Sequence, residues 1–213
     1  MSRAIIVSGG SIGDYSYYKN KIKEDDFIIC ADGGIKHLLE MGIYPHLWLG
    51  DFDSCKFCEI VSKNPKLKEV ETITLNTKKN ETDTHYACIK AIDRGYKEIV
   101  IWAALGGRID HAISNIHLLE FLKNNGAKGT IEDEKNTLCL CSEELIIQKK
   151  RKYLSILPIS SSAVIKSTNG LLYPMENFTL TRDISMGVSN EIINEEASIS
   201  LSSGLVLVAE SDD

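Results

Sequence analysis

The sequence predicts α/β plus all-β architecture, with an N-terminal Rossmann-like parallel α/β domain followed by a small C-terminal β-sandwich. Three observations support this. Apolar strand-like segments alternate with helical segments through the first half, and the second half contains only short alternating segments. The composition, 43% hydrophobic and 25% charged, is that of a globular protein. We expect one domain over residues 1–127 and another over 128–213.

The strands predicted in the first half share a pattern, in which a short apolar run ends in glycine or aspartate. They are "RAIIVSGG" at 3–10, "DFIICADGG" at 26–34, "LWLGDFDS" at 47–54 and "EIVIWAALGG" at 98–107. Runs that are apolar on both faces are typical of parallel strands, which helices cover from both sides. We therefore expect these segments to form a buried, mostly parallel sheet.

Helical spacing of apolar residues predicts helices between these strands, at 35–42, 82–95 and 110–126. Gly42 and Gly95 stand where the first two helices would end, and Thr82 can cap the second. The apolar residues expected to face inward on the third are Ile113, Ile116 and Leu119.

From about residue 128 no segment is long enough for a helix, and apolar and polar residues alternate. The expected strands include "TLCLC", "ELIIQ", "YLSILPI", "AVIKS", "FTLTR", "ASISLSSG" and "LVLVAE". Regular short strands separated by turns are typical of a half-buried sandwich. The break between the two parts lies near "NNGAKG".

The charge balance and hydropathy exclude some classes of partner. With a net charge of −6 the chain has no uniform basic field, so nucleic acid is not an expected partner. No apolar run has the length of a membrane span, and the N-terminal segment reaches glycine too soon for a signal peptide. We expect a cytoplasmic protein that acts on small molecules.

Two aspartates follow the third strand. Asp51 and Asp53 are two residues apart, so in extended backbone both carboxylates point to one side. Like charges this close repel unless a hard cation lies between them, and Mg²⁺ normally takes one or two carboxylates together with phosphate oxygens. We therefore interpret the pair as a magnesium site, with a polar loop as the alternative.

Other acidic residues and glycines are expected at the same sheet edge, where ligands of open α/β sheets bind. Asp32 precedes Gly33 and Gly34, whose backbone would approach a phosphate; the alternative is an aspartate that only caps a helix. Asp83 opens the helix at 82–95, where contact with the helix dipole is the simpler role.

A cation and an acid share the last strand-to-helix junction of the first half, "GGRIDHAISN". Arg108 is suited to grip a phosphate, and Asp110 to orient Arg108 or a substrate amine. His111 serves equally well as a surface residue, and Asn115 lies on the following turn.

The four aspartates, Arg108 and the glycine turns together indicate phosphoryl chemistry on a magnesium-bound nucleotide, which needs positioning and charge neutralisation. The chain lacks a GxxxxGK[ST] sequence, so it is not a standard P-loop enzyme. Two alternatives stay open: a phosphatase with an aspartate nucleophile, and a catalytically silent regulator that binds its ligand without turnover.

Six motifs in order resemble the thiamine pyrophosphokinase family over most of the chain: "ADGG", "GDFDS", "KNETD", "LGGRIDH", "GLLYP" and "SMGVSNE". The resemblance implies a homodimer in which the α/β domain binds ATP and the β-sandwich helps to hold thiamine in a cleft between subunits. It also implies Mg²⁺-dependent transfer of the pyrophosphoryl group of ATP to the thiamine hydroxyl, giving thiamine diphosphate and AMP.

The resemblance assigns roles by position. The residues matching the family's catalytic acidic set are Asp32, Asp51, Asp53 and Asp83, with the last three implied as metal ligands. Those on the ATP side are Gly33, Gly34, Arg108, Asp110, His111 and Asn115. Those on the thiamine side are Tyr173, a platform for a cationic heterocycle, and Ser189 and Asn190. By themselves these three indicate only an edge-strand aromatic and a turn.

Two positions depart from the family pattern. Asn80 stands where the family often has aspartate, so a supporting charge near the metal is absent. Leu172 stands where a basic residue is common. The general base for the alcohol proton is Asp83 or Asp53, and the sequence does not choose between them.

Overall fold

The computed structural model describes residues 2–52, 57–76 and 80–213. The chain divides into two compact units, Met1–Glu134 and Lys135–Asp213. The sequence places the division after residue 127, before the strand β6 (Lys128–Glu132), which in the structure belongs to the first unit and pairs with β5. The fold is mixed α/β, with parallel strands in the first unit and antiparallel strands in the second.

The first unit is built on a parallel sheet in the order β6-β5-β1-β2-β3-β4. Its other strands are β1 (Ala4–Val7), β2 (Phe27–Ala31), β3 (Leu47–Gly50), β4 (Glu71–Thr74) and β5 (Glu98–Trp102). Because all six are parallel, their carboxyl ends meet at one edge. The strand order runs outward in both directions from β1, which makes the edge at β1, β2 and β5 a topological switch point, where ligands of open sheets bind.

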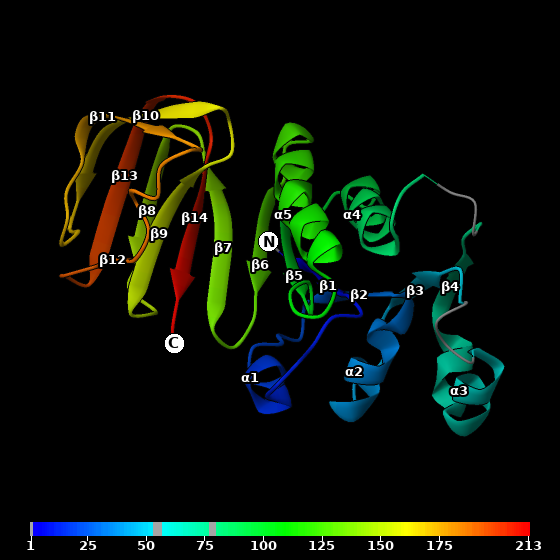
Figure 1. Ribbon diagram of the computed structural model, residues 1–213. Helices are drawn as coiled ribbons and strands as arrows, with labels where there is room; N and C mark the ends of the chain where they lie inside the picture. Colours follow the sequence, from blue (N-terminus) through cyan, green and yellow to red (C-terminus); the bar gives the residue numbers. More distant parts are fainter. Residues whose placement is uncertain (1, 53–56, 77–79) are drawn as a thin grey trace. The chain divides into compact units, whose positions relative to one another are not determined.

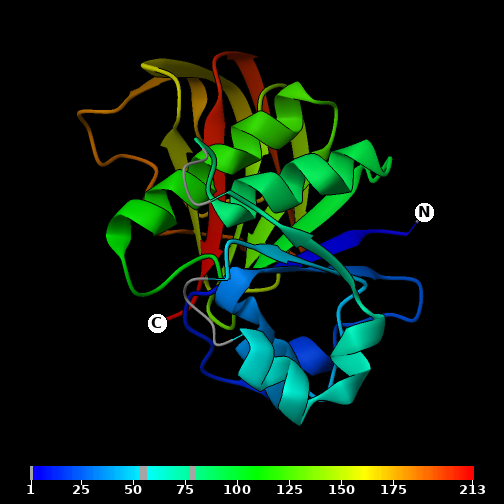
Figure 2. The ribbon, with the colours of Figure 1, turned by 90° about the vertical axis from the view of Figure 1, so that its right-hand side faces the viewer.

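Helices cover both faces of this sheet. They are α1 (Tyr15–Lys19), α2 (Ile35–Glu40), α3 (Phe57–Lys63), α4 (Asp83–Asp93) and α5 (Ile109–Asn124). In Figure 1 and Figure 2, α4 and α5 lie on one face and α1, α2 and α3 on the other. Short 3-10 turns span Asp32–Gly34 and Pro65–Glu69. This covering explains why β1, β2, β3 and β5 are almost wholly apolar.

The helix signals read from the sequence are confirmed at α4. The Thr82 hydroxyl accepts a hydrogen bond from the backbone N–H of His85, and Gly95 takes a positive φ of 86° just beyond the last turn. The inward face expected for α5 is wrong at its start. Ile113 is 48% exposed, and the helix packs on the sheet through later residues, Leu118, Leu119 and Leu122.

The second unit consists of antiparallel strands. One set runs in the order β12-β9-β14-β7 and the other in the order β11-β10-β13-β8. The strands are β7 (Asn136–Cys141), β8 (Glu144–Gln148), β9 (Tyr153–Pro158), β10 (Ser162–Asn169), β11 (Glu176–Thr181), β12 (Asn190–Glu191), β13 (Glu196–Ser203) and β14 (Val206–Ser211).

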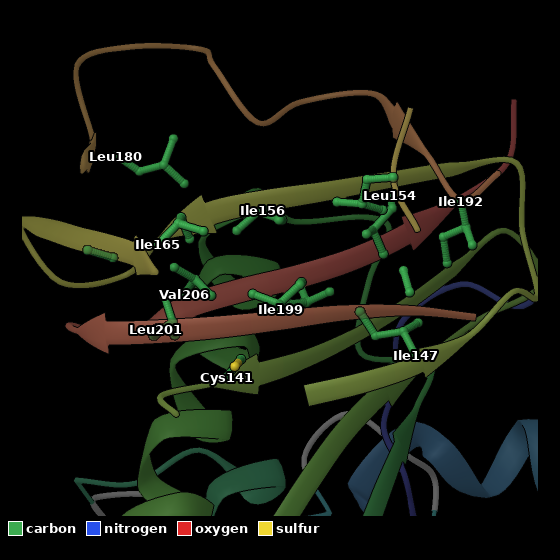
Figure 3. Close-up of a cluster of buried hydrophobic side chains, with 14 residues drawn as sticks. Cys141, Ile147, Leu154, Ile156, Ile165, Leu180, Ile192, Ile199, Leu201 and Val206 are labelled. Atoms are coloured by element: carbon green, nitrogen blue, oxygen red, sulfur yellow. The ribbon is translucent and has the colours of Figure 1, made fainter. Parts of the chain in front are cut away.

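Both sets of strands contribute to one apolar core in this unit. Figure 3 shows Leu154 and Ile156 of β9 pointing into the same cluster as Ile165 of β10 and Ile199 of β13. Every second residue of β13 is buried from Ala197 to Leu201, the alternation that the sequence shows in "ASISLSS".

Among the described residues, no helix is both long and apolar enough to cross a membrane.

Candidate active site

Three carboxylates gather at the carboxyl edge of the parallel sheet. Asp32 follows β2, Asp51 follows β3, and Asp83 is the first residue of α4. One oxygen from each lies within 4.8 Å of the others. Asp53, which the sequence places in the same set, lies outside the described residues. The structure therefore brings together three of the four aspartates predicted as catalytic.

The donor set fits a hard divalent cation. Three carboxylate oxygens this close are unfavourable without a compensating charge, and oxygen ligands of this kind suit Mg²⁺ rather than a softer metal. The residues that would hold the ion are Asp32, Asp51 and Asp83.

A cavity of about 820 Å³ lies at the same edge of the first unit. Its volume suits a ligand of nucleotide size. The predicted site residues that line it are Asp32, Gly33, Asp83, Arg108, His111 and Asn115. Of the predicted residues that the structure describes in this unit, Gly34, Asp51 and Asp110 are not in the lining. Gly34 instead packs closely against the backbone of β1.

Arg108 and Asp110 form an exposed ion pair beside this cavity. Both nitrogens of the guanidinium fork contact the carboxylate: Nε is 3.1 Å from Oδ1, and Nη2 donates to Oδ2. The hydrogen bond from Arg108 lowers the pKa of Asp110 to about 2. Asp110 thus orients Arg108, which lines the cavity.

Asn115 and His111 have different surroundings, although both line the cavity. Asn115 is buried, and its Nδ2 donates to the carbonyl of Ala104 at 2.8 Å, tying α5 to the turn after β5. His111 is exposed on the first turn of α5.

Several polar residues of the cavity were not predicted. Ser8, at the end of β1, shares a buried hydrogen bond of 2.8 Å with the Thr84 hydroxyl. Lys36 donates from Nζ to the Gly9 carbonyl at 3.3 Å. Lys36 and Lys63 both line the cavity, in addition to Arg108. The signal for Ser8 was present, because "VSGG" repeats the strand-to-glycine pattern of "CADGG".

His37 supports the glycine turn after β1. Its ring is buried, with Nε2 at 2.7 Å from the Gly10 carbonyl and Nδ1 at 2.9 Å from the Tyr15 hydroxyl. Because a carbonyl only accepts, Nε2 carries the proton, and Nδ1 accepts from the tyrosine in the neutral ring. Burial lowers the pKa of His37.

This buried histidine predicts a loss of stability in acid. As pH falls below about 6.5, the ordinary histidine value, the unfolded chain takes up a proton that the folded ring resists, so the free energy of unfolding falls. In the variant His37→Gln, we expect the free energy of unfolding to change less with pH between about pH 7.5 and about pH 5.5 than in the wild type. Urea unfolding across that range checks it, and equal slopes for the variant and the wild type would show that another group is responsible.

In the second unit, the predicted residues Tyr173 and Asn190 lie together. The Asn190 side chain is 3% exposed, and it clamps the backbone of Tyr173 from both sides. Its Oδ1 accepts from the Tyr173 N–H at 3.0 Å, and its Nδ2 donates to the Tyr173 carbonyl at 2.7 Å. The Tyr173 side chain itself is exposed, the residue being 65% accessible. The asparagine thus fixes the tyrosine and leaves its ring available.

Ser189 adopts the left-handed conformation, with φ of 57°, and its N–H donates to the Ser155 hydroxyl at 3.0 Å. The two positions that depart from the family pattern, Asn80 and Leu172, are both exposed.

Two family models match this chain. "Thiamin pyrophosphokinase, catalytic domain" matches residues 18–131, and "Thiamin pyrophosphokinase, vitamin B1 binding domain" matches residues 143–206. The thiamine pyrophosphokinase of Bacillus subtilis (strain 168) is 30% identical over 217 residues, with 98% of each protein covered.

Solved structures give the same relationship. A crystal structure of thiamine pyrophosphokinase from Bacillus subtilis aligns with a TM-score of 0.89 at 27% identity and covers all of both chains. A crystal structure of thiamin pyrophosphokinase from Geobacillus thermodenitrificans aligns with a TM-score of 0.86, also at 27% identity, covering 100% of this chain and 98% of that one.

Proposed function

Because this chain belongs to the thiamin pyrophosphokinase family, whose members are enzymes that make thiamine diphosphate, we propose that it transfers the pyrophosphoryl group of ATP to the hydroxyl of thiamine. The observation that carries the proposal is the cluster of Asp32, Asp51 and Asp83 at the edge of a nucleotide-sized cavity. Family membership favours this reaction over a phosphatase with an aspartate nucleophile and over a silent binder.

The reaction breaks one phosphoanhydride bond and forms one phosphate ester bond. The thiamine hydroxyl oxygen attacks the β-phosphorus of ATP, and the bond from that phosphorus to the oxygen bridging the α- and β-phosphates breaks. That oxygen leaves with AMP, and the β- and γ-phosphates remain on thiamine. The hydroxyl proton passes to a base, for which Asp83 and Asp53 are the candidates.

The carboxylate cluster is proposed to hold Mg²⁺ through Asp32, Asp51 and Asp83, with Asp53 completing the set. Magnesium, when bound, neutralises phosphate charge and so favours attack by the alcohol. The three aspartates hold their carboxylate oxygens close together at the carboxyl edge of the sheet. The phosphates of the nucleotide are therefore expected to bind at this edge.

The cationic and glycine-rich parts of the cavity are proposed to hold the ATP phosphates and their developing charge. Arg108, oriented by Asp110, reaches the phosphates at the cavity mouth. Gly33, which lines the cavity and has open space beside it, lets the backbone approach them, while Gly34 lets the same turn pack against β1. His111 and Asn115 lie on the nucleotide side.

The second unit is proposed to bind thiamine, with the Tyr173 ring stacked on its cationic heterocycle and Ser189 and Asn190 beside it.

We also propose a homodimer with the active site at the subunit interface. Several large apolar side chains exposed in this unit support it: those of Leu172, Ile184, Met186, Val188 and Ile193. Sedimentation equilibrium is expected to give a mass twice the 23.7 kDa of one chain. A monomer at the concentration of the activity assay would contradict an active site at a subunit interface.

Phosphorus NMR of the purified protein with ATP, magnesium and thiamine tests the reaction. We expect AMP and thiamine diphosphate in equal amounts, with neither formed when thiamine or metal is left out. Formation of ADP and thiamine monophosphate would mean that a single phosphoryl group moves. Absence of turnover would contradict the proposed function.

Replacing Tyr173 by alanine is expected to raise KM for thiamine about tenfold, because a desolvated cation–π contact contributes about 1–2 kcal/mol. Tyr173→Phe retains a ring at the same position and should stay within about twofold of the wild type. The KM for ATP should not change in either variant. A Tyr173→Ala enzyme with an unchanged KM for thiamine would show that the ring does not contact the substrate.

A further inference from the structure

Trp48, in β3, is a buried indole that contacts the carboxylate cluster through the backbone. Its ring is 0% exposed, and Nε1 donates to the Asp32 carbonyl at 3.1 Å. Trp48 belongs to the strand that ends at Gly50, directly before Asp51. One strand therefore leads to one carboxylate of the cluster and, through an indole N–H, restrains another.

Asp32 needs such a restraint because its backbone is in an unfavourable conformation. Its φ is 41°, in the left-handed region that residues with a side chain rarely adopt. The Asp32 carbonyl also accepts from the N–H of Ile35, and the Cys30 thiol lies 3.8 Å from it. These donors restrain the peptide after Asp32, the residue whose carboxylate has an oxygen within 4.8 Å of those of Asp51 and Asp83.

Gly50 also lies close to Asp32. A methyl group at Gly50 would lie 2.9 Å from both Cα and Cβ of Asp32, closer than a Cβ atom normally comes to a non-bonded atom. Residues two apart on a strand face the same way, so Trp48 and Gly50 meet Asp32 from one face of β3. The Trp48 indole donates a hydrogen bond to Asp32, and the absence of a side chain at Gly50 leaves space for Asp32 to pack against β3.

The indole is itself fixed by aromatic neighbours. Its centroid lies 5.0 Å from the ring of Phe52 and 4.9 Å from that of Phe57. Phe52 directly follows Asp51 and also has a left-handed φ, of 59°. Trp48 thus touches residues that set the backbone at two carboxylates, Asp32 by hydrogen bond and Asp51 through the packing of Phe52.

We propose that Trp48 is a positioning residue, which holds Asp32 and Asp51 at the separation that a shared divalent cation requires. The inference rests on the proposed function, because that function gives the carboxylates their cation. It concerns the affinity of the metal-free protein for the ion, so it is tested without turnover.

The chain offers a matched control, because it contains two tryptophans and both are fully buried. Trp102, on β5, packs edge-on against Tyr18, and among the described residues no hydrogen-bond partner faces its Nε1. Replacing either tryptophan by phenylalanine removes similar volume from the core. Only Trp48→Phe removes a donor to Asp32.

The test is a Mn²⁺ titration of the metal-free full-length protein, with free Mn²⁺ read by electron paramagnetic resonance. We expect Trp48→Phe to weaken binding by at least about tenfold, the usual cost of losing a group that orients a metal ligand. Trp102→Phe should stay within about twofold of the wild type. Equal affinity in all three proteins, or an equal loss in both variants, would overturn the proposal.

A second substitution guards against a Trp48→Phe chain that does not fold. Benzothienylalanine at position 48 keeps the size of the indole and replaces only its N–H by sulfur. The same loss of Mn²⁺ affinity is expected, and wild-type affinity would refute the role of the hydrogen bond. Wild-type protein that binds Mn²⁺ but makes no thiamine diphosphate would contradict the proposed reaction and leave the Trp48 comparison intact.

Discussion

Asp51→Asn is expected to lower kcat for thiamine diphosphate formation by about 10³-fold. Asparagine keeps the size of the side chain and removes its negative charge, so the cluster with Asp32 and Asp83 holds a divalent cation less well. The phosphates then lose much of the neutralisation on which transfer depends, and losing one such electrostatic contact typically costs about 10²–10³ in rate. Steady-state assay of AMP release, at one fixed magnesium concentration that saturates the wild type, measures the effect.

The control is Asp93→Asn, at the far end of α4, where the carboxylate is exposed and pairs with Lys90. This variant should keep its rate within about twofold of the wild type. Asp53→Asn extends the test to the aspartate outside the described residues. If Asp51→Asn retained more than about a tenth of the wild-type kcat, the cluster would not be the site of phosphate neutralisation.

Gly34→Ala is expected to destabilise the first unit by about 3 kcal/mol, within the range for overpacked sites. A methyl group at Gly34 would lie 2.1 Å from the Val7 carbonyl oxygen and 3.0 Å from that of Ser8. Both are backbone atoms at the end of β1, so the strand must move to make room. Urea unfolding followed by circular dichroism measures the change.

The neighbouring glycine is the control for this prediction. A methyl group at Gly33 meets nothing within 4 Å, so Gly33→Ala should change the free energy of unfolding by less than about 1 kcal/mol. Both positions lie in the same 3-10 turn, so backbone propensity is matched. Equal stability of the two variants would mean that the close contact between Gly34 and β1 is relieved at no cost.

Much of the first unit was predictable because its signals are local. The strands β1, β2, β3 and β5 are short apolar runs followed by glycine or aspartate. Thr82 and Gly95 mark the two ends of α4. Four elements of the first unit were not predicted: α1, α3, β4 and β6. Of these, α3 and β4 lack such signals. β4 is an edge strand with mostly exposed residues, and α3 buries none of its side chains completely.

The candidate site also contains residues that were predictable from local sequence signals and residues that were not. Asp32, Asp51 and Asp83 were predictable because parallel strands bring their carboxyl ends to one edge. Trp48, His37 and Asn190 were not assigned these contacts, because each acts through a hydrogen bond to the backbone of a residue at least 16 positions away. A sequence pattern does not encode which distant carbonyl or amide a buried side chain reaches.

Asp32, Asp51 and Asp83 are proposed to bind one divalent cation together with the ATP phosphates. The most direct measurement is anomalous diffraction from crystals grown with Mn²⁺, thiamine and α,β-methylene ATP, whose bridging carbon prevents the bond cleavage. We expect one anomalous peak within coordination distance of these carboxylates and of the β-phosphate. A nucleotide bound at this edge with its metal held away from all three aspartates would contradict it.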